Sequence, residues 1–136
     1  MTQDIRLSTS GDPLANPRLS LRLHFDQGLT FGRGKADLLQ AICDDGSISA
    51  AGRRMRMSYR RAWALVEEMN TTFAEPLVDS ARGGSGGGGA ALTDKGREVL
   101  AHYRALEALL REAGADHLDA LCGALRATVE PEPPKG

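Results

Sequence analysis

The apolar positions near the start of the chain change from a period of two residues to a helical period. Between residues 19 and 25 every second residue is apolar, the pattern of a β-strand with one buried face. From residue 35 the spacing is helical and ends at Gly46, a residue type that commonly follows the last turn of a helix. The pattern therefore predicts a short strand and then a helix, with buried positions at Ala36, Leu39, Ile42 and Cys43.

Two further helices separated by a tight turn are predicted next. Ser47 and Ser49 stand where an N-cap is expected before a short helix, and Ser58 can cap the helix after it. Residues 59–73 carry an apolar stripe formed by Tyr59, Ala62, Trp63, Val66, Met69 and Phe73. We interpret Trp63 as a core anchor rather than a base-stacking residue. Two short helices, of which the second begins with exposed arginines, indicate a helix-turn-helix.

A β-hairpin and two more helices complete the pattern. Residues 76–81 and 90–93 are predicted strands, and the glycine-rich segment between them is the predicted tip of a wing. Thr93 can cap a long helix that breaks at Gly114, and another amphipathic segment follows. A small winged domain has little room to bury both helices, so we expect their apolar faces to form a dimer seam. Packing against the same protomer is the alternative.

Charge is distributed unevenly, although the net charge is only −1. Residues 53–104 carry 9 basic and 6 acidic groups, whereas residues 105–136 carry 3 and 6. A run without any acid contains five arginines: Arg53, Arg54, Arg56, Arg60 and Arg61. Guanidiniums without carboxylate partners repel one another unless an anion neutralises them, and arginine suits phosphates and guanine edges. This cluster indicates a polyanionic partner and favours nucleic acid.

Length and composition limit what the chain can be. At 136 residues, with 41% hydrophobic and 26% charged residues, it is expected to form one domain with flexible tails at residues 1–18 and 130–136. No stretch approaches the roughly 18 apolar residues of a membrane span, and the start lacks the apolar segment of a signal peptide. We therefore expect a cytoplasmic protein with no membrane partner. Cys43 and Cys122 lack CxxC spacing and are interpreted as buried thiols.

No motif for catalysis or cofactor binding emerges from the sequence. The glycine run at residues 84–89 satisfies GxGxxG, but no strand–helix–strand unit surrounds it and the next helix starts only at Thr93. We expect no enzyme, no cofactor, no metal and no small-molecule effector site. A metal-responsive or redox-responsive regulator is an alternative, and it would use Cys43, Cys122, His24, His102 and His117.

Several short segments together point to a family: GSIS at 46–49, SYRRAW at 58–63, EMN at 68–70, RGGSGGGGAALT at 82–93, and Gly96. Through them residues 31–110 resemble the amino-terminal DNA-binding domain of the ModE-type molybdate-responsive transcription regulators, which is related to the LysR-type winged helix. The resemblance implies dimerisation through helices that flank the wing domain and binding to a pseudo-palindromic operator. Full ModE-type regulators continue into molybdate-binding modules, for which this chain has too few residues, so we expect no molybdate sensing by this polypeptide.

The expected fold is mainly α with a small β-wing, a winged helix-turn-helix at residues 19–92 followed by dimerisation helices at 93–129. We expect a sequence-specific transcription regulator that binds double-stranded DNA as a homodimer. The alternative is an interaction partner that forms mixed dimers with a full-length regulator. In the first case the arginines of residues 53–56 contact phosphates, and Ser58, Arg60 and Arg61 enter the major groove. Arg82 and the wing glycines follow the adjacent backbone or minor groove. The candidate DNA-binding residues are Ser49, Arg53, Arg54, Arg56, Ser58, Tyr59, Arg60, Arg61, Arg82, Gly83, Gly84, Ser85 and Gly86.

Overall fold

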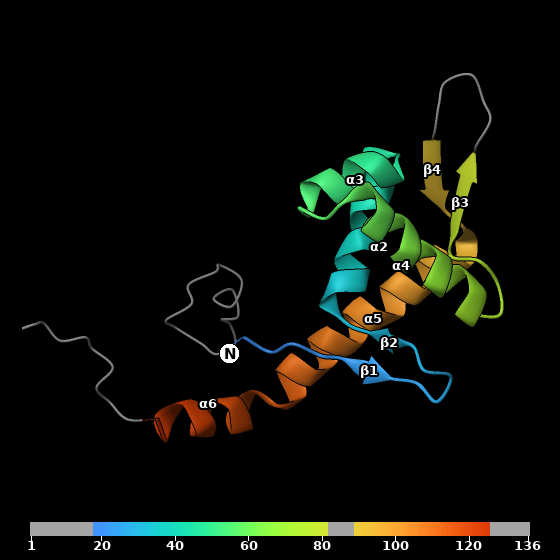
Figure 1. The fold of residues 1–136 in the computed structure, drawn as a ribbon. Helices are drawn as coiled ribbons and strands as arrows, with labels where there is room; N and C mark the ends of the chain where they lie inside the picture. Colours follow the sequence, from blue (N-terminus) through green and yellow to red (C-terminus); the bar gives the residue numbers. More distant parts are fainter. Residues whose placement is uncertain (1–17, 82–88, 126–136) are drawn as a thin grey trace, which may run out of the picture. The chain divides into compact units, whose positions relative to one another are not determined.

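The structure is a computed structural model that describes residues 18–81 and 89–125 (Figure 1). The predicted tails and the predicted tip of the wing at residues 82–88 fall outside these ranges. The chain divides into two compact units, one of residues 20–106 and one that combines residues 1–19 with 107–136. All members of the hydrophobic core cluster belong to the first unit.

A short antiparallel ribbon begins the larger unit. β1 (Leu23–His24) pairs with β2 (Thr30–Phe31). The turn between them is closed by a hydrogen bond from the Gly28 amide to the Phe25 carbonyl, and Gly28 adopts a φ of 93° that glycine accommodates. The strand predicted at residues 19–25 is confirmed in place, but its ladder is much shorter than predicted and Phe25 is 40% exposed.

Three helices form the centre of this unit: α2 (Arg33–Asp45), α3 (Ile48–Arg54) and α4 (Tyr59–Thr72). They confirm the three helices predicted from the sequence, and α3 packs against both α2 and α4 (Figure 1). Burial of each large aliphatic side chain contributes about 1.5–3 kcal/mol. The buried residues of these helices are Ala36, Leu38, Leu39, Ala41, Ile42, Ile48, Ala51, Ala62, Val66 and Met69.

Local capping interactions define the ends of these helices. The Ser47 Oγ accepts a 2.9 Å hydrogen bond from the Ala50 amide at the start of α3. At the start of α4, the Ser58 Oγ accepts a 3.0 Å hydrogen bond from the Arg61 amide. α2 ends at Gly46, whose φ of 73° is the left-handed conformation that closes many helix C-termini. The predicted caps at these three positions are therefore confirmed.

The predicted burial of Cys43 is wrong. Cys43 is exposed, because the buried stripe of α2 runs through Leu39 and Ile42 and the next residue is rotated by about 100° away from it. Cys122 is partly exposed, and both cysteines are free thiols.

A β-hairpin follows α4 and forms the base of the predicted wing (Figure 1). β3 (Val78–Ala81) and β4 (Gly89–Leu92) pair antiparallel in a register that sets Val78 opposite Leu92. Together with α2, α3 and α4 this hairpin confirms the mainly α winged helix-turn-helix fold.

Hydrogen bonds tie the base of the hairpin to the helices. The Ala90 amide donates a 2.9 Å hydrogen bond to the carbonyl of Gly46 at the end of α2. The Thr93 Oγ1 donates to the Pro76 carbonyl at 2.7 Å and accepts from the Gly96 amide at 2.9 Å. Thr93 therefore closes the hairpin and caps the next helix, as the sequence predicted.

α5 (Asp94–Ala113) completes the core of the larger unit. A Cβ at Gly96 would lie 2.1 Å from the Leu77 carbonyl oxygen, so only glycine lets this helix approach the residue before β3 so closely. Leu100 and Tyr103 are buried, and the Tyr103 hydroxyl donates a 2.7 Å hydrogen bond to a backbone carbonyl at residue 21. The first part of α5 is thus integral to the core.

The second unit contains the end of α5 and α6 (Ala115–Gly123), which are separated at Gly114 as predicted. None of the residues of α6 is buried. Leu109, Leu121 and Leu125 are 60%, 67% and 70% exposed. Over residues 18–81 and 89–125, no helix is both long and apolar enough to cross a membrane.

Candidate nucleic-acid interface

The turn between α3 and α4 holds the two helices in a tight arrangement. The Arg56 amide donates to the Arg53 carbonyl at 3.0 Å, and the Met57 amide donates to the Gly52 carbonyl at 2.9 Å. A Cβ at Gly52 would lie 3.1 Å from the Cβ of Ala62, so the glycine allows the helices to approach closely. This helix-turn-helix geometry is one in which the second helix can enter the major groove of DNA.

The first turn of α4 presents its side chains to solvent. Ser58, Tyr59, Arg60 and Arg61 are all exposed, and the Tyr59 ring lies edge-on to the ring of Trp63 with 6.1 Å between centroids. The interpretation of Tyr59 as part of the buried stripe is wrong, because the buried face of α4 begins one turn later, at Ala62, and Tyr59 is 58% exposed. This exposure leaves the tyrosine free for contacts outside the domain.

Trp63 is partly buried and packs against the core, which supports its interpretation as a core anchor. Its Nε1 is buried without a hydrogen-bond partner among the described residues. This packing holds the indole at the edge of the core.

The five clustered arginines are all exposed, but they differ in their partners. The Arg54 guanidinium binds both carboxylate oxygens of Asp45, through Nη2 at 2.6 Å and Nε at 3.1 Å. Arg53 donates from Nη1 to the Oγ of Ser49 at 3.3 Å. The remaining three arginines are Arg56, Arg60 and Arg61. Within the described part of the chain, none of them forms an ion pair with a carboxylate.

The premise that all five arginines lack a carboxylate partner is therefore wrong for Arg54. The hydrogen bond from Arg54 lowers the pKa of Asp45, and the same bond raises the pKa of Arg54. Asp45 lies at the end of α2, outside the acid-free run, so the run alone did not reveal the pair. Four arginines keep an unneutralised charge on the surface formed by α3 and the start of α4.

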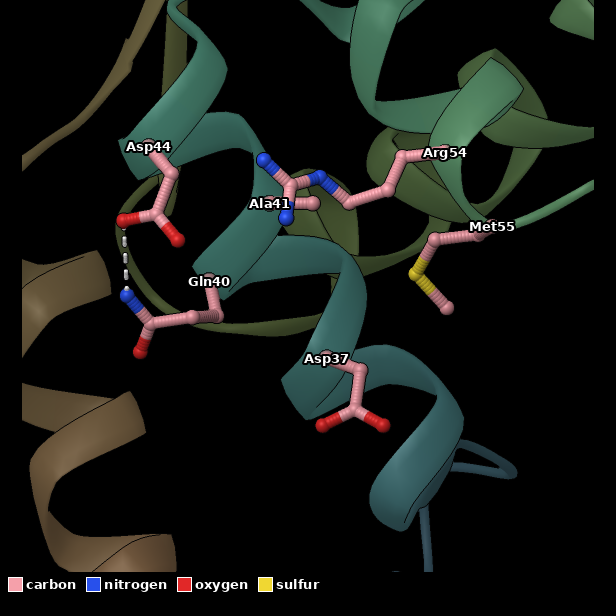
Figure 2. Close-up of a pocket in the computed structure, with 6 residues that line it drawn as sticks. All are labelled: Asp37, Gln40, Ala41, Asp44, Arg54 and Met55. Carbon is pink, nitrogen blue, oxygen red and sulfur yellow. Dashed lines mark hydrogen bonds between the residues drawn. The ribbon is translucent and has the colours of Figure 1, made fainter.

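An open hollow of about 360 Å³ lies beside this surface (Figure 2). Figure 2 shows Asp37, Gln40 and Asp44 along α2, with Arg54 and Met55 reaching over from the end of α3. Gln40 donates to Asp44 at 3.1 Å, and Asp37 accepts from Arg104 at 3.0 Å. The acidic side of α2 is unsuited to a phosphate backbone, so the basic surface is bounded on this side.

Asn70 positions the wing, a role that the sequence reasoning missed. Its Oδ1 accepts hydrogen bonds from the Leu77 amide at 2.8 Å and the Val78 amide at 3.1 Å, and its Nδ2 donates to the Val78 carbonyl at 3.0 Å. The sequence offered one indication of this role. Asn70 lies in the last turns of α4, and its amide side chain can donate and accept hydrogen bonds at the same time. The predicted wing residues Arg82, Gly83, Gly84, Ser85 and Gly86 lie outside the described residues.

The residues proposed for metal sensing are not gathered into a site. His24, His102 and His117 are exposed. Among the residues that the structure describes, no group of three or more histidine, cysteine, aspartate or glutamate side chains could hold a metal ion.

Comparison with known families identifies the helix-turn-helix. Residues 35–97 match the family described as "Bacterial regulatory helix-turn-helix protein, lysR family". The match spans most of α2, then α3, α4, β3 and β4, and the start of α5, and these elements supply most of the core residues.

Comparison with curated proteins confirms the resemblance to ModE-type regulators. The chain is 47% identical over 81 residues to the "Molybdenum-pterin-binding protein MopB" of Rhodobacter capsulatus, covering 60% of this chain and 30% of that protein. It is 42% identical over 87 residues to the "Molybdenum transport protein ModE" of Azotobacter vinelandii, covering 64% and 32%. The "DNA-binding transcriptional dual regulator ModE" of Escherichia coli is 37% identical over 93 residues, covering 68% and 36%. The chain spans about a third of the length of these relatives.

Proposed function

We propose that this chain, whose residues 35–97 form a helix-turn-helix domain of the LysR type, is a sequence-specific DNA-binding transcription regulator similar to ModE. The observation that carries the proposal is the exposed first turn of α4, where Arg60 and Arg61 have no carboxylate partner among the described residues. Unpaired guanidiniums at the start of the second helix suit guanine edges in the major groove. A DNA partner also agrees with the cytoplasmic location expected from the sequence.

The arginines divide into two proposed classes. Arg60 and Arg61, with Ser58 and Tyr59, contact base edges and set the preferred sequence, and each arginine discriminates by about 1–3 kcal/mol. Arg53 and Arg56 contact phosphates, with Ser49 held beside Arg53 by their hydrogen bond. Arg54 contributes least, because its charge is already neutralised by Asp45. The wing residues 82–86 follow the neighbouring backbone or minor groove.

The regulator is proposed to bind a pseudo-palindromic operator as a homodimer. The support comes from Leu109 and Leu110 at the end of α5, Leu121 in α6 and Leu125 just after α6, which leave large apolar surfaces in solvent. A second copy of the chain would bury the same leucines on both partners. A mixed dimer with a full-length regulator would use the same surface, and the mass of the purified chain by light scattering distinguishes the two.

The deciding experiment incubates the purified chain with a genomic fragment pool at two salt concentrations and sequences the retained DNA. We expect one palindromic motif and an affinity that falls steeply as salt rises. The names of the relatives make genes of molybdenum transport the first operators to examine. Salt-sensitive retention without any motif would contradict sequence-specific regulation, and no retention would contradict DNA binding altogether. The Arg60→Ala/Arg61→Ala double variant should lose the motif, whereas Arg111→Ala, which removes a charge from the last turn of α5, should keep it.

A further inference from the structure

The turn between α3 and α4 contains a backbone conformation that glycine normally supplies. Arg56 has a φ of 59°, and it is the one residue other than glycine with a positive φ among those described. The hydrogen bonds from its amide to Arg53 and from the Met57 amide to Gly52 define a Schellman motif, in which Arg56 occupies the position after the C-cap. Side chains at that position meet a steric penalty that glycine avoids.

The same domain shows the usual solution at another helix end. α2 terminates at Gly46, whose φ is 73°. No atom lies within 4 Å of a Cβ built on Gly46, so this glycine is required by its backbone conformation and not by lack of space. Gly46 and Arg56 therefore share the left-handed backbone conformation, and the chain places glycine at the end of α2 and arginine after the end of α3.

No contact in the described part of the fold offsets the steric penalty at Arg56. The Arg56 side chain is exposed, and within residues 18–81 and 89–125 it forms no hydrogen bond or ion pair. The arginines on either side that have no carboxylate partner, Arg53 and Arg60, have the same sign and add repulsion. Arg54, by contrast, is neutralised by Asp45.

We propose that the Arg56 guanidinium binds a DNA phosphate, and that this contact explains why arginine occupies a position where glycine would be more stable. The residue thereby lowers the stability of the fold and raises the affinity for DNA of any sequence. The inference rests on the proposed function. Arg56 lies between the helix that crosses the backbone and the helix that enters the groove, which places it at the groove edge, where phosphates and not base edges are within reach. Its contribution is therefore the same on operator and non-operator DNA.

Three substitutions at this position separate the backbone effect from the charge. Arg56→Gly relieves the steric penalty and removes the charge, so the Tm should rise by about 2–5 °C. Its Kd should rise about tenfold on operator and non-operator DNA alike, and the slope of log K against log salt should become shallower by about 0.9. Arg56→Gln removes the charge but keeps a side chain in the left-handed conformation, so it should match the binding loss with a smaller rise in Tm than Arg56→Gly. Arg56→Lys should keep most of the affinity and the wild-type salt slope.

The matched control is Arg111→Gln, which removes one exposed charge from α5 and should leave the salt slope unchanged. A higher Tm for Arg56→Gly with unchanged binding would overturn the inference, and so would a lower Tm, because the side chain would then support the fold. A loss confined to operator DNA would show a base contact and would also overturn it. In each case the wild-type chain would still select its motif, whereas failure of the wild type to bind DNA would refute the proposed function itself.

Discussion

Both units of the chain contain amphipathic helices, but the apolar side chains of these helices are covered to different extents. In α2, Leu38, Leu39 and Ile42 are 0% exposed, because α3 and β4 pack against this helix. In the second unit, Leu121 and Leu125 are 67% and 70% exposed. Both stripes follow a helical period. The comparison shows that periodicity predicts a helix and its apolar side. Whether that side is buried depends on elements distant in sequence or on another molecule.

Glycine substitutions should give the largest contrast between the units. Gly96→Ala would bring a Cβ to 2.1 Å from the Leu77 carbonyl oxygen, so α5 and the base of β3 must separate. We expect the free energy of unfolding to fall by at least about 3 kcal/mol. Urea denaturation followed by the fluorescence of Trp63 measures this.

Gly123→Ala in α6 is the control, since nothing lies within 4 Å of its added Cβ. The same measurement should change by less than about 0.5 kcal/mol. Equal losses in the two variants would show that the close contact at Gly96 does not govern the packing of α5.

The exposed leucines provide the next test of the comparison. The double variant Leu121→Gln/Leu125→Gln removes apolar surface that the proposed homodimer buries. We expect light scattering to show a change from dimer to monomer and operator affinity to fall about 100-fold, because the two half-sites are no longer bound together. Asp119→Asn, an exposed change in α6, should leave both properties unchanged. A wild-type chain that is already monomeric, or a variant that stays dimeric, would contradict the proposed seam.

Asn70 tests how firmly the wing is attached within the larger unit. Asn70→Ala removes three hydrogen bonds to the backbone of Leu77 and Val78 and leaves those groups without their partner. We expect a loss of about 2 kcal/mol in the free energy of unfolding. Amide hydrogen exchange in β3 should also accelerate. Thr71→Ala, which removes a hydroxyl bonded only to carbonyls of its own helix, should change the free energy by less than about 0.5 kcal/mol.

The features that were predictable from sequence are those determined by neighbouring residues. The caps at Ser47, Ser58 and Thr93 follow from a hydroxyl beside a helix start, and Gly46 follows from the conformation of a helix end. The partners of Asn70 could not be predicted, because they depend on how the chain returns from α4 into the hairpin.

The candidate site divides in the same way. The exposed arginines at the start of α4 were predictable from helical periodicity and the position of the cap. The pair between Arg54 and Asp45 was not, because it crosses the turn between α2 and α3 and joins residues on different helices. Tyr59 was misplaced because its exposure depends on where the buried face of α4 begins, which the apolar pattern alone does not give.

The pair between Arg54 and Asp45 gives the smallest expected effect. In Asp45→Asn the guanidinium loses its carboxylate partner and becomes available to a phosphate. We expect Kd for DNA to fall about twofold to threefold, with a salt slope steeper by about one phosphate contact. Binding titrations over a series of salt concentrations measure both quantities.

Asp44→Asn is the matched control, because it removes the same charge next to Asp45 but leaves the pair with Arg54 intact. If both variants tighten binding equally, the effect comes from net charge and not from release of Arg54. Acid provides an independent check. Because the hydrogen bond from Arg54 lowers the pKa of Asp45 in the folded chain, the stabilisation it provides is present above the ordinary carboxyl pKa and is lost as the pH falls through the lowered value. Asp45→Asn should therefore remove a small part of the acid sensitivity of the Tm below about pH 4.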